Sequence, residues 1–124
     1  MQIQAKDENR KPSKEEELLL ADTMVLYGNS LANYALEVQG TPKVPQSKAF
    51  EDGKRYVAAG LDIRTRLGDQ KTIPENTFTL GYVYFCHAQC LWGHPKQKHV
   101  YSVDENDTAE SLYKSCLQFY FQAA

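Results

Sequence analysis

The segment 77–92, TFTLGYVYFCHAQCLW, constrains the fold most, because about half of its residues are aromatic or aliphatic and none is charged. Other elements must cover such a segment, since leaving it in water would expose a large apolar surface. The β-branched and aromatic residues of 77–85 favour a strand buried on both faces, and Gly81 marks a bulge or a close backbone approach. The rest of the chain is therefore expected to surround this strand.

Two further segments favour strands. Residues 54–67 alternate between two sets of side chains with period two, which predicts a strand. A helix over 47–67 is the competing interpretation, but its two internal glycines, Gly53 and Gly60, would each cost a helix about 1 kcal/mol. Residues 99–103 predict a third strand, which would pair with the strand of the uncharged segment as an antiparallel hairpin.

Helices are predicted at both ends of the chain. A capping box formed by Ser13 and Glu16 predicts a long helix that starts at Lys14, and the glycine and prolines that follow its apolar stripe end it. The poor helix formers at 28–30 mark a natural place for a break in this helix. A second capping box at 107–110 and the apolar stripe after it predict a C-terminal helix.

These patterns together predict one α+β domain over residues 13–124, preceded by a mobile arm over 1–12. The long N-terminal helix, a short helix at 47–51 and the C-terminal helix would pack with a small antiparallel sheet of about three strands. An all-α fold is the alternative. A chain of 124 residues with 42% hydrophobic content suits one core, and it needs neither a metal nor a disulfide to fold.

One stripe of the N-terminal helix has two interpretations. Its apolar residues recur in alternating steps of four and three, which keeps them on one helical face. They either pack into the core or form the seam of a homodimer, since a continuous helix of about 38 Å would exceed the roughly 28 Å width of a domain this size. The candidate interface residues are Leu20, Met24, Tyr27, Leu31 and Tyr34.

The overall charge limits the classes of partner. A net charge of −2 and a pI near 5.9 argue against the broad attraction to phosphate that a generic nucleic-acid or membrane-surface binder shows. No uncharged run reaches the roughly 18 apolar residues of a membrane-spanning helix, and the N-terminal residues lack the apolar segment of a signal peptide. The odd number of cysteines, three, then indicates reduced thiols in the cytoplasm.

Four residues near the end of the uncharged segment, Cys86, Cys90, His94 and His99, are of the types that bind zinc. In its span and its Gly-His pair this stretch resembles the zinc knuckle, a family that binds single-stranded nucleic acid. It differs in its first gap, which has three residues, and in His99, which stands where the knuckle has cysteine. On a strand the two cysteines would lie roughly 13 Å apart, so zinc binding needs a turn or helix; otherwise they are apolar core residues.

A candidate basic patch combines charges from the strand predicted at 54–67 with charges near the hairpin tip. If these side chains meet on one surface, they suit phosphates, nucleotides or an acidic protein. The competing interpretation is a solvated face balanced by Asp62 and Asp69. The residues of the candidate patch are Lys54, Arg64, Arg66, Lys96 and Lys98.

The sequence favours a small non-enzymatic interaction module, homodimeric and cytoplasmic, that acts as a regulator, inhibitor or chaperone by binding another protein. A nucleic-acid or nucleotide binder that uses the basic patch, with or without zinc, is the alternative. A cysteine-dependent enzyme is the third hypothesis, in which a turn would bring His87 to Cys90 and activate its thiol. The chain has no glycine-rich phosphate loop, no H-E-x-x-H and no G-x-S-x-G pattern, and apart from zinc we expect no cofactor.

Overall fold

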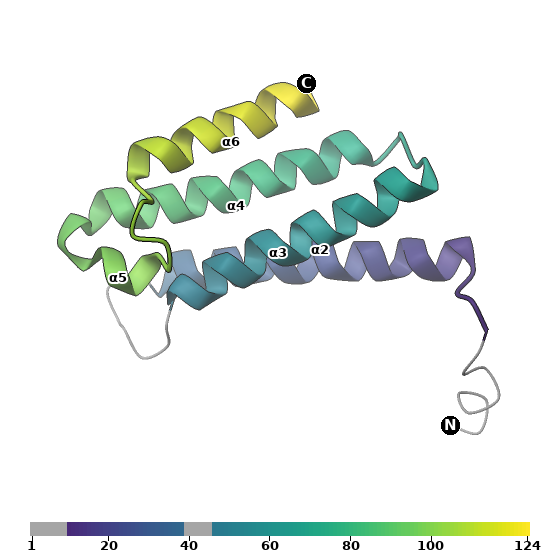
Figure 1. Cartoon of the computed structure of the whole chain (residues 1–124), viewed down its shortest axis with the longest axis horizontal. Coiled ribbons are helices and arrows are strands. Elements are labelled where there is room, and N and C mark those ends of the chain that lie inside the picture. Colours follow the sequence, from purple (N-terminus) through teal and green to yellow (C-terminus); the bar gives the residue numbers. More distant parts are fainter. Residues whose placement is uncertain (1–9, 39–45) are drawn as a thin grey trace.

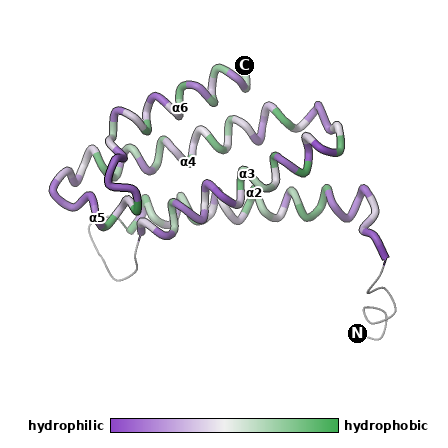
Figure 2. Tube along the Cα trace, viewed as in Figure 1, coloured by the Kyte–Doolittle hydropathy of each residue, from purple (hydrophilic) through white to green (hydrophobic). Residues whose placement is uncertain are grey.

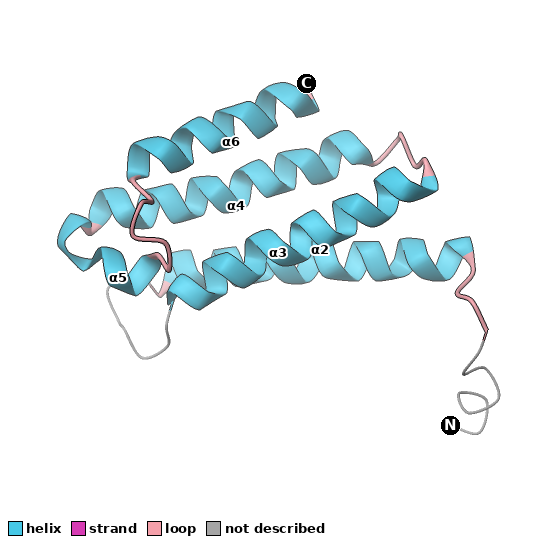
Figure 3. Ribbon diagram, viewed as in Figure 1, coloured by secondary structure: helices cyan, strands magenta, loops and turns pink. Residues whose placement is uncertain are grey.

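The structure, a computed structural model, describes residues 10–38 and 46–124, which contain helices and connecting turns but no strand, as Figure 3 shows. The α+β prediction is therefore wrong, and the fold is the all-α alternative. Successive long helices run in opposite directions (Figure 1). The elements are α2 (Lys14–Glu37), α3 (Gln46–Leu67), α4 (Ile73–Gly93), the 3-10 turn η1 (Pro95–Gln97), α5 (Lys98–Tyr101) and α6 (Ala109–Ala123). Most of the predicted N-terminal arm, residues 1–9, lies outside the described residues.

Both terminal helices begin with a capping box. The Glu16 backbone N–H donates to the Ser13 hydroxyl (3.1 Å), and the Ser13 N–H donates to the Glu16 carboxylate (3.0 Å), which confirms the predicted start of α2. The box of α6 is formed by Thr108 and Ser111, one residue later than the predicted box at 107–110. In both helices the side chains satisfy backbone N–H groups that have no partner within the helix.

Glycines explain why 54–67 is part of a helix and not the predicted strand. Gly28 of α2 and Gly53 and Gly60 of α3 lie where these two helices meet. A Cβ at Gly28 would lie 2.6 Å from the carbonyl oxygen of Gly53, and a Cβ at Gly60 would lie 2.8 Å from that of Ala21. The backbones therefore approach so closely that glycine is required, and this contact outweighs the roughly 1 kcal/mol that each glycine costs a helix. For the same reason α2 continues through Gly28 without a break.

The uncharged segment is the helix α4, and not a strand over 77–85. The three other long helices, α2, α3 and α6, pack against α4, so its side chains are apolar around most of its circumference. The core of the molecule forms here and includes the fully buried Val83, Cys86 and Cys90. A buried helix and a strand buried on both faces share this all-round apolar pattern, which is why the sequence misled the prediction.

The strand predicted at 99–103 is also absent. Residues 98–101 form α5, and the fully buried Tyr101 holds this short helix against the core. The ring of His94 stacks on the Tyr101 ring with 5.2 Å between centroids. One buried aromatic ring, and not strand pairing, therefore fixes this segment.

The last helix, α6, packs only on α4 in the part of the chain that is described, and it lies on the side of α4 away from α2 (Figure 1). The short helix predicted at 47–51 is the start of the much longer α3. Figure 2 shows hydrophilic residues gathered around η1 and α5 and in the segment before α6. Hydrophobic residues instead recur along the long helices, and on α2 they occur on two sides.

Candidate functional site

Half of the exposed large hydrophobic side chains of the described residues lie on one helix. We define the outer face of α2 by Leu19, Leu20, Leu26, Tyr27 and Tyr34, which are 44–67% exposed. Leu19 and Leu26 are seven residues apart, and the same interval separates the other three. Helical geometry therefore aligns them in two rows on one side of α2, which together extend about four turns. The exposed Thr23 and Ser30 lie between the two rows, and their hydroxyls donate to carbonyl oxygens of the same helix.

The opposite face of α2 is made of small residues and is already packed. It contacts α3 and α4, and the close approach at Gly28 excludes larger side chains there. Rolling α2 about its axis would force leucines and tyrosines into this contact, so the helix cannot bury its outer face within the single chain. The buried residues of this face are Ala21, Val25, Gly28, Ala32 and Ala35.

Three of the five predicted interface residues belong to the outer face, whereas Met24 and Leu31 are half-buried beside it. Sequence analysis missed Leu19 and Leu26, although their spacing of seven residues was the signal that could have found them. The structure therefore keeps most of the predicted seam out of the core. It is the structure of one chain, so the homodimer stays a prediction.

Contacts with α3 fix the rotation of α2 at one edge of this face. The ring of Tyr27 meets the ring of Tyr56 edge-on, with 4.8 Å between centroids and 81° between planes. Near the start of α2, Arg66 donates a hydrogen bond of 2.7 Å to the Glu17 carboxylate. These contacts present the outer face on a rigid support.

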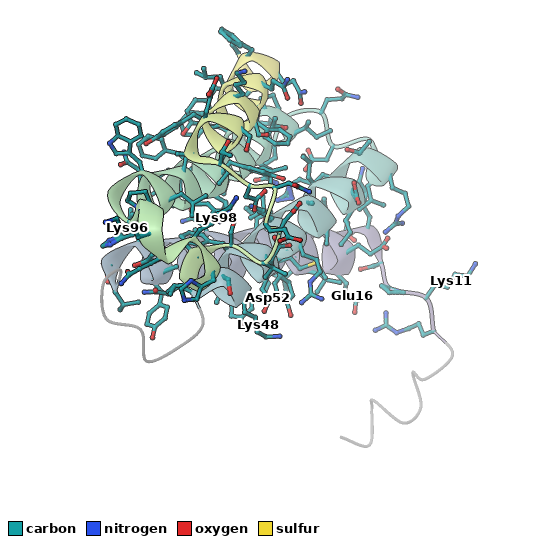
Figure 4. The ribbon with its side chains drawn as sticks, turned by 60° about the vertical axis from the view of Figure 1, so that its left-hand side comes forward. Lys11, Glu16, Lys48, Asp52, Lys96 and Lys98 are labelled. Atoms are coloured by element: carbon teal, nitrogen blue, oxygen red, sulfur yellow. The ribbon has the colours of Figure 1, made fainter. Side chains whose placement is uncertain are left out.

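The structure separates the residues of the predicted basic patch. Arg64 and Arg66 lie near the C-terminal end of α3, whereas Lys96 and Lys98 lie near α5 at the other end of the bundle (Figure 1). Figure 4 shows the same two lysines beside α5, far from Lys11 near the start of α2. Two residues apart on a helix, Arg64 and Arg66 also point in different directions. The two arginines were predicted to share a face because alternate side chains of a strand point the same way, and this does not hold in the helix α3.

Most of these basic groups also have partners. Arg64 is 3% exposed and pairs with the carboxylates of Asp22 and Asp69. Lys98 donates to a backbone carbonyl oxygen, that of Glu105. Lys54 lies in a groove between α3, α4 and α6, 4.6 Å above the ring of Tyr84, where burial lowers the pKa of its amine. The lining of this groove also includes three carboxylates, those of Glu51, Asp104 and Asp107.

A buried chain of hydrogen bonds connects α4 to the segment before α6. The Ser102 hydroxyl donates to the Asp107 carboxylate (2.6 Å) and lies 2.9 Å from Nε2 of His87. Because the single hydroxyl proton goes to Asp107, His87 must donate its Nε2 proton to Ser102. The His87 ring is fully buried and stacks on Phe50 with 4.6 Å between centroids.

The three hydrogen-bonded residues are of the types found in a catalytic triad, but their order does not activate a nucleophile. In a serine hydrolase the histidine lies between serine and aspartate and removes the serine proton. Here Ser102 lies in the middle and its proton points to Asp107. Burial and the nearby Lys54 charge lower the pKa of His87 to about 3, so the ring is neutral at physiological pH. These hydrogen bonds therefore act as a structural link, which sequence analysis missed because 15 residues separate His87 from Ser102.

The structure brings two of the four candidate zinc ligands together. Cys86 and Cys90 are buried on successive turns of α4, while His94 stacks on Tyr101 and His99 is exposed on α5. No three histidine, cysteine or acidic side chains of residues 10–38 and 46–124 are placed to hold one metal ion. Burial raises the pKa of Cys90 to about 12 and also raises the pKa of Cys86, so both are neutral thiols and poor ligands as they stand.

We expect the three thiols to resist alkylation in the folded protein. Cys86, Cys90 and Cys116 are buried and burial raises the pKa of each, so little thiolate is present and the reagent has no access. Iodoacetamide at neutral pH should label the native chain at least about a hundredfold more slowly than the unfolded chain. Mass spectrometry of a time course measures these rates. Rapid labelling of Cys90 alone would instead support the cysteine-dependent enzyme.

The other exposed hydrophobic residues are distributed over several elements. Trp92, 73% exposed, borders an apolar pocket of about 430 Å³ between the end of α4 and the start of α6. Leu117 and Phe121, one turn apart, are exposed on α6, Phe78 is exposed on α4, and Val103 is exposed in the segment before α6. None of these groups is as long or as large as the outer face of α2, which is why we treat that face as the candidate site.

Comparison with models of protein families gives no match for this chain, and comparisons with curated proteins and with solved structures give none either. Among the described helices, none combines the length and the apolar character needed to cross a membrane.

Proposed function

We propose that this chain is a small non-enzymatic interaction module that binds another protein along the outer face of α2, and so acts as a regulator, inhibitor or chaperone. The observation that carries the proposal is that five large apolar side chains are exposed on one face of a helix whose opposite face is fully packed. Exposed apolar surface of this extent on a soluble protein marks sites of protein association.

The physical gain from covering this face is large enough to drive binding. Fully burying a leucine side chain is favourable by about 1.5–3 kcal/mol, and tyrosine is enriched among the residues that dominate binding energy. The face is also presented on a rigid helix, so little conformational entropy would be lost when a partner docks. This combination suits a surface that recognises a protein.

Nucleic-acid or nucleotide binding is the competing proposal. Its support is now confined to the cluster of Lys96, Lys98 and His99 at the α5 end, because Arg64 and Arg66 are paired with carboxylates at the other end. Binding through several phosphate contacts would weaken steeply as salt concentration rises, whereas burial of the apolar face predicts a much weaker dependence on salt. A salt titration of binding therefore separates the two proposals.

The triple variant Leu19→Ser, Leu26→Ser and Tyr27→Ser should lose the partner while keeping the fold. All three side chains are exposed, so the free energy of unfolding should change by only about 1 kcal/mol or less, apart from the loss of the Tyr27 ring contact. Affinity capture from an extract of the cells that make the protein, with quantitative mass spectrometry, should show at least one protein reduced at least about tenfold.

The matched control is a variant with exposed apolar residues changed elsewhere, Trp92→Ser, Val103→Ser and Leu117→Ser, which removes as many large side chains. It should retain the same captured protein. A partner lost with the control variant and kept with the α2 variant would move the site to the α6 side of the molecule and contradict the proposal.

A further inference from the structure

The charges of α2 are strongly unequal. The helix contains five acidic residues and one basic residue, Lys14, which by helical phase points away from the outer face. Among the acidic residues, Glu15 and Asp22 flank the row of Leu19 and Leu26 near the start of the helix. Glu37 lies in line with that row at the other end. The apolar rows are therefore bordered by negative charge at both ends.

Most basic side chains near this face are already bound. Arg66 pairs with Glu17, Arg64 pairs with Asp22, and near the helix start Arg10 pairs with Glu16. On α3, Arg55 pairs with Asp52. Glu15 and Glu37, in contrast, have no ion pair with any described residue. The excess charge along the outer face is thus carboxylate that nothing in the described chain neutralises.

This charge disfavours a second copy of the chain as the occupant. In a parallel pair of α2 helices, Glu15 would lie near Glu15 and Glu37 near Glu37. In an antiparallel pair, Glu15 of one copy would lie near Glu37 of the other. Both arrangements place like charges together at each end of the apolar rows, which opposes association.

We propose that the occupant is a basic amphipathic helix of another protein, an inference that rests on the proposed function. Its apolar residues, at helical spacing, would cover the two rows of the outer face, and lysine or arginine beside them would pair with Glu15 and Glu37. The rows extend over 16 residues from Leu19 to Tyr34, or about 22 Å, and the distance along α2 from Glu15 to Glu37 is about 33 Å, so the bound segment has about six turns.

A pair of synthetic peptides tests this proposal on the full chain. Both are fluorescein-labelled amphipathic helices of about six turns with leucine at the apolar positions; one has lysine at the flanking positions and the other has glutamate. In fluorescence anisotropy the lysine peptide should bind with micromolar affinity, and the glutamate peptide at least about tenfold more weakly. The variant Leu26→Ser with Tyr27→Ser should weaken binding of the lysine peptide at least about tenfold.

A charge-swap variant makes the test specific. Glu15→Lys with Glu37→Lys should weaken the lysine peptide about fivefold at low salt and strengthen the glutamate peptide. The matched control, Glu105→Lys with Glu110→Lys, changes the net charge equally, includes one first-turn helix residue as Glu15 is, and lies away from α2. It should change neither affinity by more than about twofold.

Three results would overturn the proposal: equal binding of the two peptides, lysine-peptide binding insensitive to the outer-face variants, or a sedimenting dimer that Leu26→Ser with Tyr27→Ser dissociates. The last would assign the face to a second copy. If the lysine peptide fails but the capture experiment still depends on Leu19, Leu26 and Tyr27, the proposed function stands and only the class of partner is wrong. If capture is also independent of these three residues, both the proposed function and the proposed class of partner are wrong.

Discussion

Replacing Gly28 by alanine should destabilise the protein by about 2 kcal/mol, and adding Gly60→Ala should bring the loss to about 4 kcal/mol. At Gly28 the new Cβ would lie 2.6 Å from the Gly53 carbonyl oxygen, and at Gly60 it would lie 2.7 Å from a methyl group of Val25. Since the nearest atoms include backbone atoms, the two helices must separate, which loosens the whole contact between α2 and α3. Urea unfolding followed by circular dichroism measures the effect.

The direction of this prediction opposes helix propensity. In an isolated helix glycine to alanine is favourable by about 1 kcal/mol, so the sign of the change reports the closeness of the helices and not helix formation. Ser30→Ala is the matched control on the same helix, because Ser30 is exposed and bonds only its own helix at Leu26. It should change the free energy of unfolding by no more than about 0.5 kcal/mol. Stabilisation by Gly28→Ala would mean that α2 and α3 lie farther apart at Gly28 than described.

The same glycines show where sequence reasoning failed. The cost of Gly53 and Gly60 to a helix was known, but the contact that compensates for it lies in α2, more than twenty residues away. Helix propensity accounts only for the local free-energy cost of glycine in a helix. The period-two pattern of 54–67 then favoured the strand over the competing helix, although the same residues also fit a helix.

The sequence did predict the elements whose signals are local. The capping box of Ser13 and Glu16 lies within one turn, and the start of α2 was found correctly. The uncharged segment was identified as the centre of the molecule, but its all-round apolarity is common to a buried helix and a buried strand. Its length was the better guide, because 16 uncharged residues exceed an ordinary strand.

The candidate site was predicted in part. The alternating steps of four and three found Leu20, Tyr27 and Tyr34, and the structure exposes all three. Whether such a stripe faces the core or the solvent depends on the other face of the helix, which here is filled by small residues that pack on α3. The link between His87 and Ser102 depends on the chain returning to α4 after α5, and no short pattern encodes that return.

His87 should make the protein sensitive to acid. Its pKa is lowered to about 3 in the fold by burial and by Lys54, whereas an unfolded chain has the ordinary value near 6.5. Between these values the unfolded state binds a proton that the folded state excludes, so stability falls as pH drops through this window and is unaffected by His87 above it. The slope is about 1.4 kcal/mol per pH unit, or about 3 kcal/mol lost at pH 4.5.

The variant His87→Gln isolates this contribution, because glutamine can still donate to Ser102 but does not titrate. Urea unfolding at neutral pH and near pH 4.5 should show wild type losing about 3 kcal/mol more than the variant. His99→Gln, which changes an exposed histidine, should behave as wild type. Glu16, whose pKa is lowered to about 2 by Arg10, affects stability mainly below about pH 4.5, so it contributes little to a comparison between neutral pH and pH 4.5. Equal acid sensitivity in wild type and His87→Gln would mean that the ring accepts a proton in the folded state, and that the link to Ser102 and Asp107 is open to water.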